Sequence, residues 1–329
     1  MADFNAVAGH ERIIKSLRES IKNDMTSHAY IFCGNKGSGR NLTAGAFAKT
    51  ANCLSPINGN ACGKCPSCIQ FESGNNPDVF YVKATKTISI SVDDIREQIV
   101  NEVKIKPYSY KRKIFIIDKA DTMTSQAQNA LLKTLEEPPK YVLIILIAEN
   151  TENFLPTVLS RCVMMKFSPI SVNLIKNYLI NNCAMNEDDA AFYAEYSIGS
   201  IGEALRLSGD ENFYQMRNDI ISCLDRLDTM DFVSAMFMAK EMEKYKAYSE
   251  LFDIMYMFYR DVFCMRLFKD DRYVIQKDKI GLIEKKAKNL NEQTIAKRLD
   301  FIMDIKKKIR QNTAFRLSME VLFMNLKEN

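Results

Sequence analysis

A glycine-rich loop between an apolar segment and a helical segment constrains the fold of this chain more than any other feature. The apolar segment spans residues 29–33, the loop residues 34–41 and the helical segment residues 42–50. Strand, loop and helix in this order form the context of a phosphate-binding loop, in which glycines let backbone N–H groups surround a phosphate. The pattern predicts an α/β fold with a parallel sheet. The candidate phosphate-binding residues are Gly34, Gly37, Gly39, Arg40 and Asn41.

Two side chains of this loop differ from the general motif. The motif G-x-x-x-x-G-K-[ST] places a lysine on the phosphates and a hydroxyl group on Mg²⁺. Arg40 stands at the lysine position and Asn41 at the hydroxyl position. Arg40 and the loop backbone can still hold phosphates weakly, so these residues leave ATP binding open.

A second apolar segment, residues 114–117, ends at Asp118. In a parallel sheet, a carboxylate at the C-terminal end of such a strand faces the phosphate loop and can hold Mg²⁺. The next residue is Lys119, and a cation cannot accept the proton of an attacking water molecule. Lys119 therefore cannot serve as the general base of an ATPase.

Four cysteines fall in one short segment with the spacing C-x8-C-x2-C-x2-C. They are Cys53, Cys62, Cys65 and Cys68. Tetrahedral Zn²⁺ takes four thiolates at about 2.3 Å, and a C-x2-C turn supplies two of them. We predict a structural zinc site within a module of about residues 53–75, because four protein ligands leave no open position for catalysis. Unpaired thiols and a redox pair are the alternatives.

Length and composition set the outer limits. A chain of 329 residues is too long for one ordinary core, so two or three domains are expected. No apolar stretch approaches the roughly 20 residues of a membrane span. The N-terminus lacks a basic start followed by an apolar run, and nine cysteines without an export signal indicate thiols or metal ligands. We expect a cytoplasmic protein.

Two further segments carry a resemblance to a known family. Residues 128–139 read Q-N-A-L-L-K-T-L-E-E-P-P, and residues 160–162 read S-R-C after another apolar strand at 141–148. With the segment 28–34 and the four-cysteine insert, they resemble the signature of bacterial clamp-loader subunits of the AAA+ class. The resemblance is dense over residues 4–208 and thins out beyond.

The resemblance implies a choice between two kinds of subunit. Motor subunits (gamma/tau) hydrolyse ATP with Lys and Thr in the loop, Glu after the strand-end Asp, and Arg in a lid motif G-S-x-R. This chain has Arg40, Asn41, Lys119 and, at the lid position, Gly202. The resemblance therefore implies the stator type, which does not hydrolyse ATP itself. A motor-type ATPase in which Arg40 replaces the lysine is the alternative.

The arginine of the S-R-C segment is retained as Arg161. In the resembled family it reaches across an interface to the ATP of a neighbouring motor subunit, as an arginine finger supplied in trans. A guanidinium suits this role because it is permanently charged and can bind phosphate oxygens in a bidentate manner. A surface or interface salt bridge is the alternative.

The resemblance also implies an architecture and a set of partners. We expect an AAA+ domain over residues 1–167, a three-helix lid over 168–208 and a C-terminal helical collar domain over 209–329. The last helical segment, 292–326, is expected to break near Gln311 and Asn312. The implied partners are the motor (gamma/tau) and delta subunits, with the sliding clamp and primer–template DNA reached through the assembly, and no membrane.

Basic residues leave one other function class open. Lys104, Lys106, Lys111, Arg112 and Lys113 cluster before the second apolar segment, and basic residues also outnumber acidic ones over residues 269–310. Such clusters can contact a phosphate backbone without reading sequence, or they can be solvated surface. A zinc-dependent nucleic-acid-binding module is therefore a further alternative.

Overall fold

A computed structural model describes residues 3–85, 89–248, 250–311 and 313–328. The chain divides into two compact units, Met1–Arg206 and Leu207–Asn329. Among the described residues, no helix is both long enough and apolar enough to cross a membrane.

The first unit is built on a five-stranded parallel sheet with the order β2-β3-β4-β1-β5. Because the strands are parallel, the segments that follow β1, β3 and β4 emerge at one edge of the sheet. The strands are β1 (Ala29–Gly34), β2 (Val79–Val82), β3 (Lys113–Ile117), β4 (Val142–Ala148) and β5 (Val163–Phe167). The three strands predicted from apolar segments are confirmed as the central strands β1, β3 and β4.

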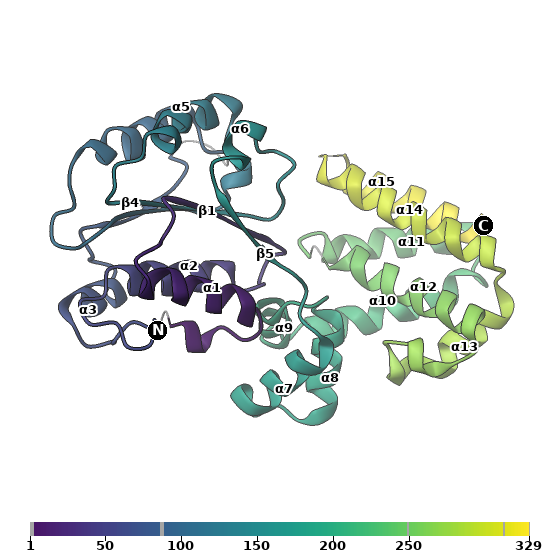
Figure 1. Ribbon diagram of the computed structural model, residues 1–329. Coiled ribbons are helices and arrows are strands. Elements are labelled where there is room, and N and C mark those ends of the chain that lie inside the picture. The colour runs from purple at the N-terminus through teal and green to yellow at the C-terminus, as the bar shows by residue number, and fades with distance from the viewer. Residues whose placement is uncertain (1–2, 86–88, 249, 312, 329) are drawn as a thin grey trace. The chain divides into compact units, whose positions relative to one another are not determined.

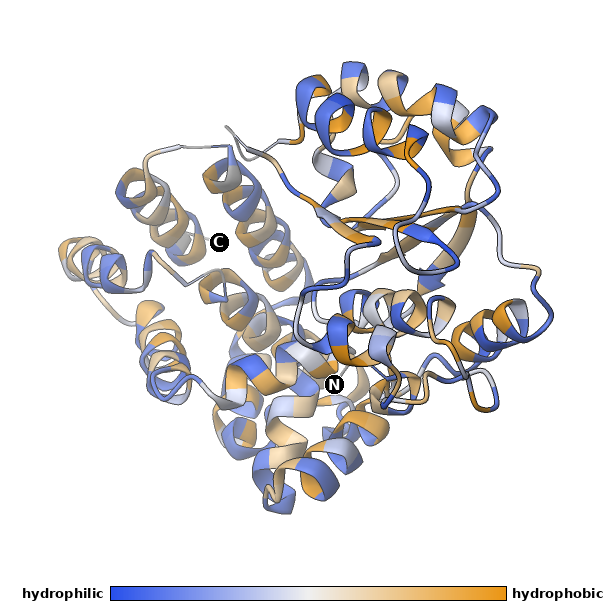
Figure 2. Ribbon diagram, turned by 90° about the vertical axis from the view of Figure 1, so that its left-hand side faces the viewer, coloured by the Kyte–Doolittle hydropathy of each residue, from blue (hydrophilic) through white to orange (hydrophobic). Residues whose placement is uncertain are grey.

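The central strands are apolar throughout because helices cover both faces of the sheet. Successive strand residues point to opposite faces, so Ile31 belongs to one buried cluster and its neighbours Tyr30 and Phe32 to the other. Figure 1 shows helices on both sides, and Figure 2 shows the hydrophobic colour of the strands. One side carries α1 (Glu11–Lys22), α2 (Arg40–Ala51) and α3 (Pro66–Glu72), and the other carries α5 (Ser125–Glu136) and α6 (Pro156–Leu159).

The two edge strands were not among the predicted elements. β2 and β5 are short and only partly buried, and Val163 and Met164 of β5 are exposed. Neither strand therefore has the continuous apolar run that marks the centre of the sheet. Between β2 and β3 lie the short helix α4 (Val92–Ile95), the π-helical turn Arg96–Val100 and the 3₁₀ turn Glu102–Lys104.

The first unit continues into three small helices, α7 (Val172–Cys183), α8 (Glu187–Tyr196) and α9 (Ile201–Ser208). They enclose a cluster of their own, in which Ile175 and Leu179 of α7 pack against alanines of α8 and α9. These helices fall close to the predicted lid ranges. We refer to residues 168–206 as the lid.

The second unit consists of helices and turns in its described residues. The break expected near Gln311 and Asn312 lies between α14 and α15; Asn312 itself is outside the described residues. The methionine and aromatic side chains Met255, Phe258 and Tyr259 are buried and belong to the core of this unit. The helices are α10 (Phe213–Leu227), α11 (Phe232–Glu241), α12 (Leu251–Phe268), α13 (Ile280–Asn289), α14 (Glu292–Arg310) and α15 (Phe315–Glu328).

Candidate functional site

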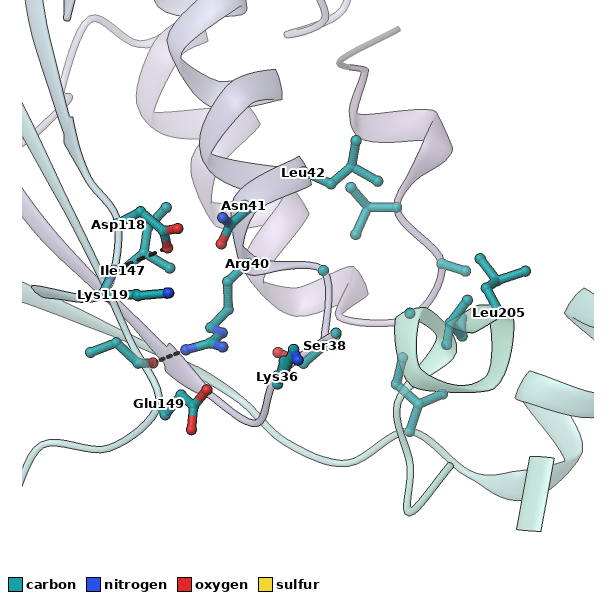
Figure 3. A pocket seen from close by; sticks show the side chains of 18 of the residues that line it. Lys36, Ser38, Arg40, Asn41, Leu42, Asp118, Lys119, Ile147, Glu149 and Leu205 are labelled. Carbon is teal, nitrogen blue, oxygen red and sulfur yellow. Dashed lines mark hydrogen bonds between the residues drawn. The ribbon is translucent and has the colours of Figure 1, made fainter. Parts of the chain in front are cut away.

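A cleft of about 610 Å³ lies in the first unit where the loop after β1, the ends of β3 and β4, and the lid meet (Figure 3). Of the residues predicted for the phosphate loop and its Mg²⁺ site, all but Gly34 line this cleft, and the four predicted zinc ligands lie elsewhere. The lining residues that matter below are Lys36, Gly37, Gly39, Arg40, Asn41, Asp118, Lys119, Asp121, Glu149 and Gly202.

The backbone of the loop adopts the left-handed conformations that glycine favours. Gly37 and Gly39 have φ values of 74° and 90°, which L-residues with a side chain rarely adopt. Helix α2 begins at Arg40 without a side-chain cap, so its first N–H groups remain available at the cleft. Gly34 has another role: a Cβ there would lie 2.4 Å from the carbonyl oxygen of Phe167, so this glycine allows β1 and β5 to pair closely.

The guanidinium of Arg40 is directed into the protein. Its side chain is buried, and Nη1 donates a hydrogen bond to the carbonyl oxygen of Ala148 at the end of β4. Figure 3 shows this contact beside Glu149. Burial lowers the pKa of Arg40, while the nearby Glu149 and Asp121 carboxylates act in the opposite direction. The positive charge of Arg40 is therefore largely compensated by groups of its own chain.

Three carboxylates stand at the same edge of the sheet. Asp118 follows β3, is exposed, and accepts the N–H of Lys119 at 3.0 Å. Asp121 accepts the N–H of Glu149 at 3.2 Å, which joins the segments after β3 and β4. Sequence reasoning missed Asp121 and Glu149, although each lies just beyond a predicted strand end, where acidic residues of parallel sheets meet.

The lid touches the phosphate loop through backbone atoms. Gly202 donates its N–H to the carbonyl oxygen of Gly37 at 3.0 Å, and the Ser200 hydroxyl donates to the carbonyl oxygen of Lys36 at 2.9 Å. A Cβ at Gly202 would lie 2.8 Å from both Cα and O of Gly37. Residue 202, where the resemblance led us to look for a lid arginine, is thus a glycine in close contact with another glycine.

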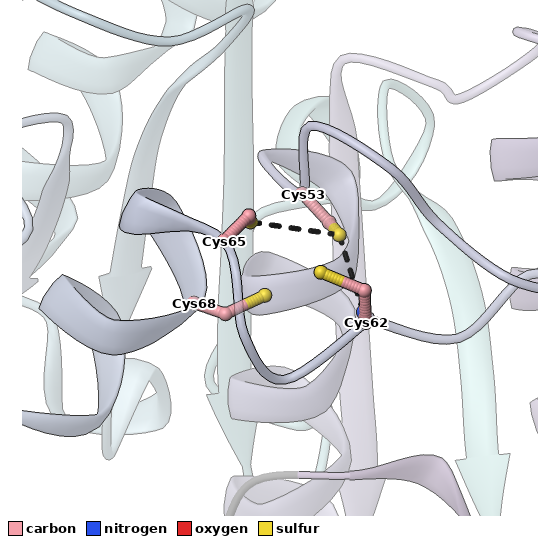
Figure 4. A group of neighbouring side chains, drawn as sticks. All are labelled: Cys53, Cys62, Cys65 and Cys68. Carbon is pink, nitrogen blue, oxygen red and sulfur yellow. Dashed lines mark hydrogen bonds between the residues drawn. The ribbon is translucent and has the colours of Figure 1, made fainter.

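The four clustered cysteines converge as predicted (Figure 4). Their sulfur atoms all lie within 4.8 Å of one another, and those of Cys53 and Cys65 are 3.9 Å apart. Four thiolates at about 2.3 Å from a tetrahedral ion would be about 3.8 Å apart, so the cluster fits a metal such as zinc. The N–H groups of Lys64 and Cys65 lower the pKa of Cys62 to about 6, which favours the thiolate.

Local turns account for this convergence. Asn58 and Gly59 both have positive φ and form a tight turn, in which Ile57 and Asn60 exchange two backbone hydrogen bonds. Pro66 then starts helix α3, whose first turn places the buried Cys68 opposite the other thiols. A bound ion would cross-link the turn to the start of α3.

Arg161 lies outside the cleft of its own chain, after α6 and before β5, and its side chain is one-third exposed. Its Nη1 donates to the carbonyl oxygen of Thr157 at 2.9 Å and to the Ser160 hydroxyl at 3.3 Å. Its Nη2 lies 2.9 Å from a carboxylate oxygen of Glu136, the last residue of α5. Sequence reasoning selected Arg161 but not Glu136.

The predicted basic cluster before β3 is only partly a surface. Lys113 is buried and paired with Glu102 at 2.8 Å, and Arg112 is also buried. Both precede or begin a central strand, so burial removes them from any contact with an external phosphate. Lys104, Lys106 and Lys111 are exposed, and Lys111 is paired with Asp24.

A parallel sheet with a phosphate loop after β1, an acidic residue after β3 and a helical lid defines the AAA+ class of nucleotide-binding folds. The family model described as "DNA polymerase III, delta subunit" matches residues 9–171, and its C-terminal counterpart matches residues 211–326. A DNA polymerase III subunit delta' of Bacillus subtilis is 30% identical over 322 residues, which is 96% of each chain. The chain belongs to this family of DNA polymerase III clamp-loader subunits.

Other relatives are tau/gamma subunits of DNA polymerase III. The DNA polymerase III subunit tau/gamma of Haemophilus influenzae is 32% identical over 230 residues, 67% of this chain and 33% of that protein. The chain thus spans about a third of that relative. A solved gamma-subunit-related protein of Thermotoga maritima is 17% identical, with 95% of this chain and 98% of that chain covered and a TM-score of 0.46.

Proposed function

We propose that this chain is the delta-prime, or stator, subunit of a clamp loader: it hydrolyses no ATP itself and supplies Arg161 to the ATP of a neighbouring motor subunit. The inward-turned Arg40 carries the first half of this proposal. A phosphate-loop cation accelerates hydrolysis only if it lies on the β- and γ-phosphates. Here the cation at that position is hydrogen-bonded to Ala148 and buried.

The charges around the cleft support the same conclusion. Asp118, Asp121 and Glu149 line the cleft, and Glu149 and Asp121 are the main acidic partners of Arg40. Their negative charge opposes a triphosphate unless metal ions neutralise it. At the position after Asp118, where motor subunits have their general base, stands the Lys119 ammonium, which cannot take a proton from water.

The lid contributes a third difference. An arginine at position 202 would have to displace the backbone of Gly37, since even a Cβ comes within 2.8 Å of it. Losing one preorganised donor to the developing charge typically costs about 3–4 kcal/mol of transition-state stabilisation. With the phosphate-loop cation, the base and the lid arginine all replaced, turnover by this chain would be negligible.

The partial exposure of Arg161 supports a role outside its own chain. Arg161 does not belong to the residues that line the cleft in the described chain, and its guanidinium keeps donors free for phosphate oxygens. We further propose that the four cysteines hold a structural zinc ion, that residues 209–329 form the collar, and that the partners are the motor and delta subunits. The clamp and primer–template DNA are then reached through the assembly.

Reconstitution tests the proposal. The chain is mixed with motor and delta subunits, and ATP hydrolysis stimulated by clamp and primed DNA is measured with wild type, Arg161→Ala and the control Arg96→Ala. Arg96 is an exposed arginine whose side chain forms, among the described residues, only a 4.0 Å ion pair with Asp93. We expect a loss of stimulated hydrolysis with Arg161→Ala alone. Equal rates for all three would exclude the trans role of Arg161.

The isolated chain tests the other half. We expect no ATP turnover above background. Turnover that disappears in Asp118→Ala would instead support the motor-type ATPase, since Asp118 is the residue predicted to hold Mg²⁺ after β3.

A further inference from the structure

The contact between Arg161 and Glu136 joins two elements that are separately anchored in the core. Glu136 ends α5, which is fixed to the sheet by Leu131 and Leu135, both buried. Arg161 follows α6, which is fixed by the buried Val158. The backbone of Glu136 is therefore held where its carboxylate can reach the guanidinium.

Three acceptors from two segments hold the guanidinium of Arg161. The carbonyl oxygen of Thr157 and the hydroxyl oxygen of Ser160 accept hydrogen bonds from Nη1. A carboxylate oxygen of Glu136 lies 2.9 Å from Nη2. A guanidinium has five N–H donors, so Nε–H and one Nη2 proton have no acceptor among the described residues and remain for an incoming phosphate. The side chain is thus oriented while some of its hydrogen-bond donors stay available.

We propose that Glu136 is a positioning residue for the arginine finger: its carboxylate pre-orients Arg161 before the neighbour's ATP arrives. The inference rests on the proposed trans role of Arg161. A long side chain that is free in solution loses rotamer freedom when it binds a phosphate, and a pre-held side chain loses less. The benefit appears in the transition state, where the finger makes its contact.

The pair is too weak to sequester the finger. Its side chains are 34% and 48% exposed, respectively, and the carboxylate approaches through one oxygen. Exposed pairs of this kind contribute little and are screened by salt. A polyphosphate with several negative oxygens can therefore add to or replace the contact. This argues for orientation and against inhibition.

The adjacent residue offers a matched control. Glu137 is also a glutamate, is exposed, and forms no ion pair with the described residues. Glu136→Gln and Glu137→Gln remove the same charge one residue apart. Any general effect of lowering negative charge near the interface is then common to both variants.

The experiment uses the reconstituted loader, with ATP as the varied substrate and clamp and primed DNA saturating. The quantity compared is the part of stimulated hydrolysis that Arg161→Ala abolishes. For Glu136→Gln we expect kcat of this part to fall about two- to fivefold, the range of an exposed pair, with an unchanged KM. Glu137→Gln is expected to equal wild type, and Glu136→Gln added to Arg161→Ala is expected to change nothing further.

The outcomes separate the two proposals. No effect of Arg161→Ala refutes the trans finger itself. A loss with Arg161→Ala but wild-type kinetics with Glu136→Gln refutes the positioning role and leaves the finger standing. A faster rate with Glu136→Gln means that the pair sequesters the finger, and an equal loss in the Arg161→Ala background means that Glu136 acts elsewhere; both overturn the inference.

Discussion

Gly202→Ala tests whether the lid is held on the phosphate loop by close backbone contact. The added Cβ would lie 2.8 Å from Cα and O of Gly37, whereas carbon atoms in ordinary contact are about 3.5–4.0 Å apart. The backbones must therefore separate by about 0.7 Å or more. That movement would stretch the 3.0 Å hydrogen bond from Gly202 to Gly37 beyond hydrogen-bonding distance.

The cost follows from three contributions. Overpacking of this kind costs about 1–3 kcal/mol, and the lost neutral hydrogen bond adds about 1 kcal/mol. Because residue 202 lies in α9, alanine regains about 0.5–1 kcal/mol of helix stability. We expect a net destabilisation of the closed lid by about 1–3 kcal/mol, which is roughly a 5- to 150-fold increase in its opening equilibrium.

Amide hydrogen exchange over residues 197–208 measures that opening. Gly281→Ala is the control, because Gly281 also lies in a helix but a Cβ there would meet no atom within 4 Å. The control should leave lid exchange unchanged and stabilise α13 by about 0.5–1 kcal/mol. Unchanged lid exchange in Gly202→Ala would show that the glycine–glycine contact does not hold the lid.

Two further predictions concern the cysteine cluster and a carboxylate of the second unit. If the cluster holds zinc as proposed, Cys68→Ser should abolish zinc binding measured by native mass spectrometry, because a hydroxyl is a poor replacement for a buried thiolate ligand. Cys183→Ser, at an exposed thiol outside the cluster, should bind zinc as wild type does. The hydrogen bond from Lys244 lowers the pKa of Asp219. A carboxyl group whose pKa is lowered by folding stabilises the folded state at pH values above its unfolded pKa of about 3.9. This contribution is lost as the pH falls through the lower, folded-state pKa. Lys244→Met should therefore reduce the acid dependence of unfolding, measured by urea titration between about pH 5 and 2, by less than about 1 kcal/mol. A pH slope equal to that of wild type would contradict this.

The centre of the first unit can be predicted from the amino-acid sequence alone. Strands β1, β3 and β4 are continuous apolar runs because both faces of the sheet are covered, and such runs are visible without a structure. The same holds for the spacing of Cys62, Cys65 and Cys68, where local turns bring the ligands together. The edge strands β2 and β5 were not predicted, because short, half-buried strands have no comparable apolar run.

The contacts of the loop residues, in contrast, depend on how distant segments pack together. That Arg40 turns to Ala148 depends on a contact between residues 108 positions apart, and the fit of Gly202 on Gly37 depends on the lid folding back onto the loop. Glu136 likewise meets Arg161 only because α5 and the turn before β5 pack on the same face of the sheet. Such contacts follow from packing between distant segments, so no local periodicity or motif could reveal them.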